Sequence, residues 1–71
     1  MSEDVFEVFG RKSSEEELKH IGYVNAPGVD LAKVYAHTVY NEENWIELCV
    51  VQRGDIIPVY NEEDKLNVKG N

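Results

Sequence analysis

One stretch near the middle of the chain, residues 45–51, restricts the possible folds more than any other part of the sequence. It reads WIELCVV, which has the length and the β-branched content of a strand. Successive residues of a strand point to opposite faces of the sheet, so this strand carries apolar residues on both faces. Strands of that kind are buried on both sides. The chain must therefore cover both faces of its sheet itself or use a second chain for one of them.

Three further elements are predicted from the residue pattern. Residues 5–9 and 20–25 are rich in β-branched and aromatic residues and predict two strands. Gly22, inside the second of them, indicates a bulge or a close backbone approach. From Leu31 the apolar residues recur with helical spacing, which predicts a helix that ends near Asn41.

The order of these elements favours one arrangement. The link from the second strand through the helix to the third resembles a crossover between parallel strands. The first strand, joined to the second by a hairpin, then lies between the other two. We therefore expect an α+β fold, with a three-stranded, mainly antiparallel sheet of order 2-1-3 and one helix packed on one face.

The predicted fold is a single domain, residues 1–71, with a core from about residue 5 to residue 60. A short extended segment is expected at residues 56–60, and a polar tail at residues 61–71. The residues predicted to form the core between helix and sheet are Phe6, Val8, Tyr35, Ala36, Val39, Leu48 and Val50.

Size and charge limit the classes of function. A core within 71 residues supplies only about 3–5 kcal/mol of net stability, which favours a partner chain. Fourteen acidic residues against seven basic ones give a net charge of −7, so nucleic acid would be repelled. The acidic balance is typical of a soluble surface and also of proteins from a high-salt cytoplasm. No apolar run is long enough to span a membrane and no secretory leader is visible, so we expect a cytoplasmic protein.

Few residues have side chains suited to catalysis or metal binding. His20 and His37 do not form a zinc-site spacing with each other or with Cys49. Cys49 lies in an apolar run with no nearby cation, which indicates a buried and inert thiol. The acidic clusters at 15–17 and 62–64 lack the alternating oxygen ligands of a calcium loop. The sequence therefore predicts no catalytic residue, no metal and no cofactor.

The second apolar face of the sheet is the best candidate for a functional surface. One helix shields only one face, and an uncovered patch of this size exceeds what soluble monomers usually leave bare. We therefore expect a homodimer or a subunit of a larger assembly, with Trp45 near the contact. The predicted interface residues are Val5, Phe9, Trp45, Cys49 and Val51.

Several short motifs occur in an order that is informative as a whole. They are Glu7-Val8-Phe9 with Arg11, His20-Ile21-Gly22, Ala26-Pro27, the helix positions Ala32, Ala36 and Tyr40, then Cys49-Val50-Val51 and Asp55-Ile56. In this order and spacing they resemble the small B subunit of the multicomponent phenylacetyl-CoA epoxidase, also called phenylacetate-CoA oxygenase. The resemblance covers most of residues 6–57. Cys49 stands where the family has a tryptophan, and family members continue with a longer tail.

The resemblance implies a non-catalytic role. In that family the diiron chemistry belongs to a different, helical subunit, and a reductase subunit supplies the electrons. The B subunit supports the assembly, so the partners implied here are other oxygenase subunits, a second copy of the chain, or both. The alternative is a stand-alone, small dimeric module with a binding or regulatory role and the same fold.

Overall fold

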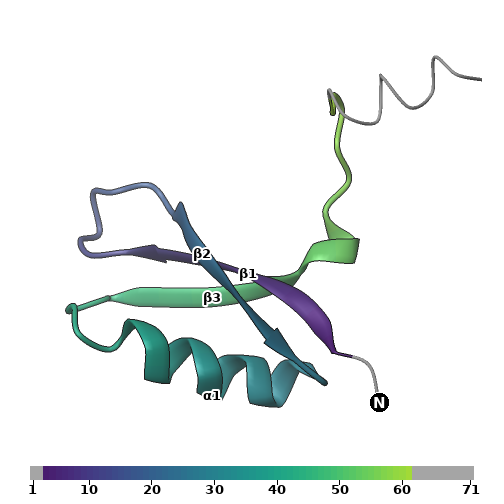
Figure 1. The fold of residues 1–71 in the computed structure, drawn as a ribbon. Helices are drawn as coiled ribbons and strands as arrows, with labels where there is room; N and C mark the ends of the chain where they lie inside the picture. Colours follow the sequence, from purple (N-terminus) through teal and green to yellow (C-terminus); the bar gives the residue numbers. More distant parts are fainter. Residues whose placement is uncertain (1–2, 62–71) are drawn as a thin grey trace, which may run out of the picture.

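The computed structural model describes residues 3–61 of the chain (Figure 1). The elements are β1 (Asp4–Arg11), β2 (Lys19–Ala26), α1 (Val29–Tyr40), β3 (Glu47–Gln52) and a 3₁₀ turn, η1 (Arg53–Asp55). The helix lies on one side of the sheet, and the chain after η1 leaves on the opposite side (Figure 1). Apart from Asn61, the predicted polar tail lies outside the described residues.

The sheet has the strand order β2-β1-β3, and both outer strands run antiparallel to β1. This confirms the predicted α+β architecture. The two outer strands are parallel to each other and are connected through α1, so the first strand in the sequence is the central strand of the sheet. All its backbone groups can therefore pair, whereas β2 and β3 each have an unpaired outer edge among residues 3–61.

The pairing of β1 with β2 contains one irregularity. Val8 pairs with Gly22, but the next residue, Phe9, pairs with His20, which leaves Ile21 as the extra residue of a bulge. A Cβ atom at Gly22 would collide with the hydroxyl group of Tyr40 at the end of α1. Gly22 thus marks both a bulge and a close approach of backbone to side chain, the two readings that its position in the sequence suggested.

Small residues set the distance between α1 and the sheet. Ala32 and Ala36, one turn apart, are the buried residues of the helix. The backbone N–H of Ala32 donates to the carbonyl of Gly28 at 3.0 Å, so the helix begins directly after the Pro27 break. Because alanine adds only a methyl group, the helix backbone can lie close to the strands beneath it.

The core is built from the even-numbered positions of β1 and the residues that face them. Its buried members are Phe6, Val8, Val24, Ala26, Ala32 and Ala36, and Ile21, Tyr40, Leu48 and Val50 pack against them while partly buried. The prediction was therefore right for Phe6, Val8 and Ala36, and Leu48 and Val50 contribute from the rim.

The core prediction was wrong for two residues of the helix. Tyr35 is 37% exposed and Val39 is 58% exposed, so both lie on the flank of α1 and outside the core. Apolar residues border the alanine stripe on one side, so the apolar face of the helix is wide. The helical spacing alone does not decide which part of that face is buried. The sheet has only three strands and covers a narrow stripe of the helix, which the alanines occupy together with Tyr40.

The segment after η1 does not cover the second face of the sheet. Residues 56–60 follow the predicted extended segment in position, but they join no strand of the sheet. Ile57 and Val59 are both 88% exposed. Figure 1 shows this part of the chain rising away from the strands.

Enlarging a buried alanine of α1 is expected to destabilise the fold. Ala36→Leu adds three carbons at a position that is 2% exposed, and overpacking of this kind costs about 1–3 kcal/mol. Urea denaturation measures the change in the free energy of unfolding. Val34→Leu, at an exposed position of the same helix, is the control and is expected to leave the midpoint nearly unchanged. An unchanged midpoint for Ala36→Leu would mean that α1 does not rest on the sheet by this stripe.

Candidate functional site

The sheet face opposite α1 is the candidate functional surface, and we call it the open face. On β1 it carries the odd-numbered residues, with Glu7 paired to both Tyr23 and Val51. Apart from η1, whose Arg53 reaches Glu7, no helix or strand among residues 3–61 lies over it. The side chains that the register places here are Val5, Glu7, Phe9, Arg11, His20, Tyr23, Asn25, Glu47, Cys49 and Val51.

A buried carboxylate occupies the centre of the open face. Glu7 is buried, and its Oε1 atom lies 2.7 Å from Nε2 of His20 on β2. Its other oxygen accepts a hydrogen bond from Nε of Arg53 in η1. These three residues connect the central strand, an edge strand and the turn after β3. The pairing satisfies a charge that would otherwise be costly to bury.

The surroundings of Glu7 favour its ionised form. The hydrogen bond from Arg53 is the main cause that lowers the pKa of Glu7; burial acts in the opposite direction, and the contact with His20 lowers the pKa further. Glu7 is therefore a carboxylate at neutral pH. A residue held in this way serves as a fixed negative centre beneath two cation-forming side chains and has little freedom to act as an acid or base.

Aromatic rings extend this cluster over the open face. The rings of Phe9 and His20 lie with centroids 5.1 Å apart and tilted by 50°. The guanidinium of Arg53 lies 5.6 Å from the centroid of Tyr23, within cation–π range. As a result, His20 and Arg53 partly cover the apolar residues of the face, and the open face is less bare than the alternation of the sequence predicts.

Protonation of Glu7 is expected to weaken the fold. Its pKa is lower in the folded chain than in the unfolded chain, where a glutamate has a pKa of about 4.3. The folded state therefore gains stability from the ionised carboxylate above that pH, and loses it as the pH falls through the lowered folded pKa. A Glu7→Gln chain is expected to lack this part of the acid dependence. Urea denaturation at a series of pH values measures it.

A second glutamate provides the control for this measurement. The pKa of Glu16 is also lowered, chiefly because its carboxylate accepts a hydrogen bond from the backbone N–H of Lys12. Glu16→Gln should therefore remove a separate share of the same acid dependence, and the double variant should remove both. If Glu7→Gln kept the full acid dependence of the unaltered chain, the cluster around Glu7 would not stabilise the fold.

Cys49 lies on the open face and is partly buried. Burial raises the pKa of its thiol, and the nearby carboxylate of Glu47 raises it further. The nucleophilic form of cysteine is the thiolate, so this environment makes Cys49 a weak nucleophile at neutral pH. Glu47 itself is held by Arg11, whose Nε donates to Oε1 at 2.7 Å.

Trp45 does not lie on the open face with the other four predicted interface residues. Strand β3 begins at Glu47, two residues later than expected, so the alternation does not extend back to Trp45. The indole N–H donates to the carbonyl of Tyr40 at 2.7 Å, and the ring lies over Gly10 on the side of the sheet that carries α1. Ile46 also precedes the strand and is 56% exposed. Val5, Phe9, Cys49 and Val51 are placed together as predicted.

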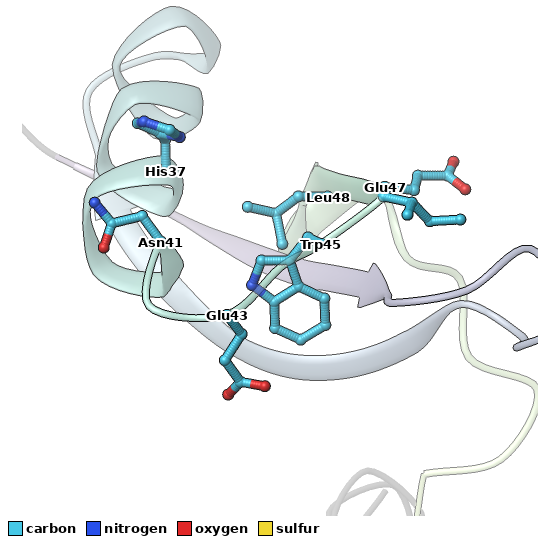
Figure 2. A pocket seen from close by; sticks show the side chains of 7 residues that line it. His37, Asn41, Glu43, Trp45, Glu47 and Leu48 are labelled. Carbon is cyan, nitrogen blue, oxygen red and sulfur yellow. The ribbon is translucent and has the colours of Figure 1, made fainter.

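A groove between α1 and β3 is the second feature of interest. Two adjacent hollows of about 230 and 220 Å³ lie along it, and both are lined by His37 and Leu48. Figure 2 shows His37 and Asn41 on the helix facing the side chains of Trp45 and Leu48 across the first hollow. Lys33 lines the second hollow.

Sequence reasoning missed the roles of His20, Arg53 and Tyr23. Glu7 was recognisable as a polar residue on an otherwise apolar face, which is the one signal in the sequence for an ion pair at that position. Its two partners lie 13 and 46 residues further along the chain. Their approach depends on the bulge in β2 and on the turn after β3.

The described residues contain neither a metal site nor a membrane-spanning helix. Within residues 3–61, no group of three or more His, Cys, Asp and Glu side chains is arranged to hold a metal ion. Over the same residues, no helix has the length and hydropathy to cross a bilayer. The acidic cluster at 62–64 lies outside the described residues.

Comparison with known proteins does not assign the chain to a family. No family model, curated protein or solved structure matches the chain.

Proposed function

We propose that the chain is a non-catalytic, protein-binding subunit of a phenylacetyl-CoA-type multicomponent oxygenase. The observation that carries this proposal is the open face, where Val5, Phe9, Cys49 and Val51 surround the buried carboxylate of Glu7. Among residues 3–61, no helix or strand other than the short η1 lies over these side chains. The ordered motifs that resemble the small B subunit of such oxygenases supply the identity of the assembly.

The composition of the open face favours a protein as its partner. Its central carboxylate is already paired with His20 and Arg53, which leaves few polar groups free to bind a small charged molecule. Much of the remaining surface consists of apolar, aromatic and arginine side chains, and aromatic residues and arginine are enriched at protein interfaces. The raised pKa of Cys49 leaves the face without an activated thiol.

Co-purification tests this function. The chain is co-expressed with the diiron oxygenase subunit encoded beside its gene, and the complex is isolated through a tag on that subunit. Val51→Lys is expected to weaken the complex at least tenfold, because it places a charge in the middle of the open face. Lysine is chosen since Val51 pairs directly with Glu7, which an added acid would repel.

Val34→Lys is the matched control, because Val34 is an exposed residue on the helix. Its complex is expected to survive. The proposal fails if the unaltered chain associates with no diiron oxygenase subunit. Sedimentation then decides whether the chain is instead a stand-alone dimer that uses the open face; because Trp45 lies on the other side of the sheet, its fluorescence does not report on that contact.

A further inference from the structure

The outer edge of β3 lacks the features that usually prevent an edge strand from pairing. The strand order places β3 at one edge of the sheet, and its pairing with β1 is regular from Glu47 to Gln52. It contains no proline and one charged residue, at its first position. The other edge strand, β2, is interrupted by a bulge, a common form of protection. Among residues 3–61, β3 is therefore the edge better suited to accept another strand.

The groove between α1 and β3 runs beside this edge. The two hollows share His37 and Leu48, so together they follow the strand from its start towards Val50. Trp45 lines the first hollow, where Figure 2 shows its ring opposite the helix, and Lys33 lines the second. An extended peptide that pairs with an edge strand directs alternate side chains to one face, where a flanking groove can bind them.

The two ends of the groove differ in whether their charged side chains are paired. At the end near Trp45, Glu47 is paired with Arg11, and Glu43 forms an ion pair with Lys12. At the other end, no carboxylate of residues 3–61 pairs with Lys33. Within residues 3–61 of a chain whose net charge is −7, this end of the groove therefore presents a lysine without an ion-pair partner.

We propose that an extended segment of a partner protein adds to the sheet as a fourth strand along β3. One apolar side chain of that segment fills the hollow beside Leu48 and His37, and an acidic side chain pairs with Lys33. This inference rests on the proposed function, since it specifies how an oxygenase subunit contacts the chain. It uses the edge of β3, whereas the proposed interface uses the open face.

A second copy of the chain fits this groove less well. Its own β3 would be the added strand, and the single acid of that strand, Glu47, is already held by Arg11 on the open face. The added strand would therefore bring no free carboxylate of its own for Lys33, and each copy brings a further net charge of −7. A partner segment with an acidic residue satisfies both the unpaired edge and the cation.

Hydrogen exchange and one charge reversal test the proposal on the complex with the diiron oxygenase subunit. We expect the amides of residues 47–52 that point away from β1 to exchange at least tenfold more slowly in the complex than in the isolated chain. Lys33→Glu is expected to weaken the complex at least tenfold. Lys19→Glu, an exposed residue at the start of β2, changes the net charge equally and is expected to have a much smaller effect.

The outcomes separate the two proposals. If the complex forms but the β3 amides exchange as in the isolated chain, or if Lys33→Glu and Lys19→Glu weaken it equally, the fourth-strand proposal is wrong and the proposed function stands. If the same amides become protected in the isolated chain as its concentration rises, a second copy occupies the edge and the proposal is wrong. If no complex forms, the proposed function itself fails, and the inference fails with it.

Discussion

The Phe6→Ala chain is expected to be largely unfolded in dilute buffer. Phe6 is 2% exposed and, with Val8, is one of the two largest fully buried side chains on the central strand. Truncation of a buried phenylalanine to alanine costs about 3–5 kcal/mol, because the apolar contacts are lost and a cavity remains. The net stability of a domain this small is itself about 3–5 kcal/mol. The loss is therefore comparable to the whole free energy of unfolding.

Far-UV circular dichroism and urea denaturation measure this effect, and Phe6→Leu provides a graded variant that retains most of the apolar contact. Phe9→Ala is the matched control: the same substitution on the same strand, but on the open face, where Phe9 is only partly buried. We expect Phe9→Ala to remain folded. Equal losses for the two alanine variants would show that the open face is packed as tightly as the core, and the assignment of the two faces would be wrong.

The two faces of β1 illustrate what the sequence could predict. Alternation alone separates Phe6 and Val8 from Val5, Glu7 and Phe9, and the pairing register confirms that separation. The strand order also followed from the sequence, because a hairpin and a helical crossover leave few ways to arrange three strands. These predictions hold because they depend on local period and connection length.

The rotation of the helix could not be predicted in the same way. Its apolar residues extend from the alanine stripe to Leu31, Val34, Tyr35 and Val39, all of them exposed. Large apolar residues normally indicate the buried side of a helix, and here they do not. The width of the sheet decides how much of the helix is covered, and that width is a property of the whole fold.

For the candidate site, too, the prediction was right for residues within regular strands and wrong for residues outside them. Four of the five predicted interface residues share the open face because they lie within regular strands. Trp45 does not, because the backbone N–H of Ile46 donates to the carbonyl of Arg11 at 3.0 Å and the chain turns before β3 begins. The partners of Glu7 were missed since they come from a bulged strand and from a turn after β3, whose positions depend on tertiary structure.

Gly10→Val is expected to disrupt the contact between Trp45 and the sheet, with the second largest loss. A Cβ atom at Gly10 would lie 2.9 Å from Cε3 of Trp45 and 3.1 Å from Cδ1 of Leu48, closer than carbon atoms normally approach. The indole cannot move freely, because its N–H is bonded to the carbonyl of Tyr40 and the ammonium of Lys12 lies 5.2 Å from the ring. Overpacking here costs about 1–3 kcal/mol, and loss of the indole hydrogen bond adds about 1 kcal/mol.

The direction of the change in the free energy of unfolding distinguishes a steric clash with Trp45 from the intrinsic strand preference of valine. Valine is intrinsically more favourable than glycine in a strand, so without the contact Gly10→Val would stabilise the chain. Trp45 is the only tryptophan, and its fluorescence during urea denaturation reports both the stability and the local environment. Gly54→Val is the control, because a Cβ atom there meets nothing within 4 Å. A Gly10→Val chain as stable as the unaltered one, with the same emission maximum, would mean that Trp45 does not rest on β1 between the sheet and the end of α1.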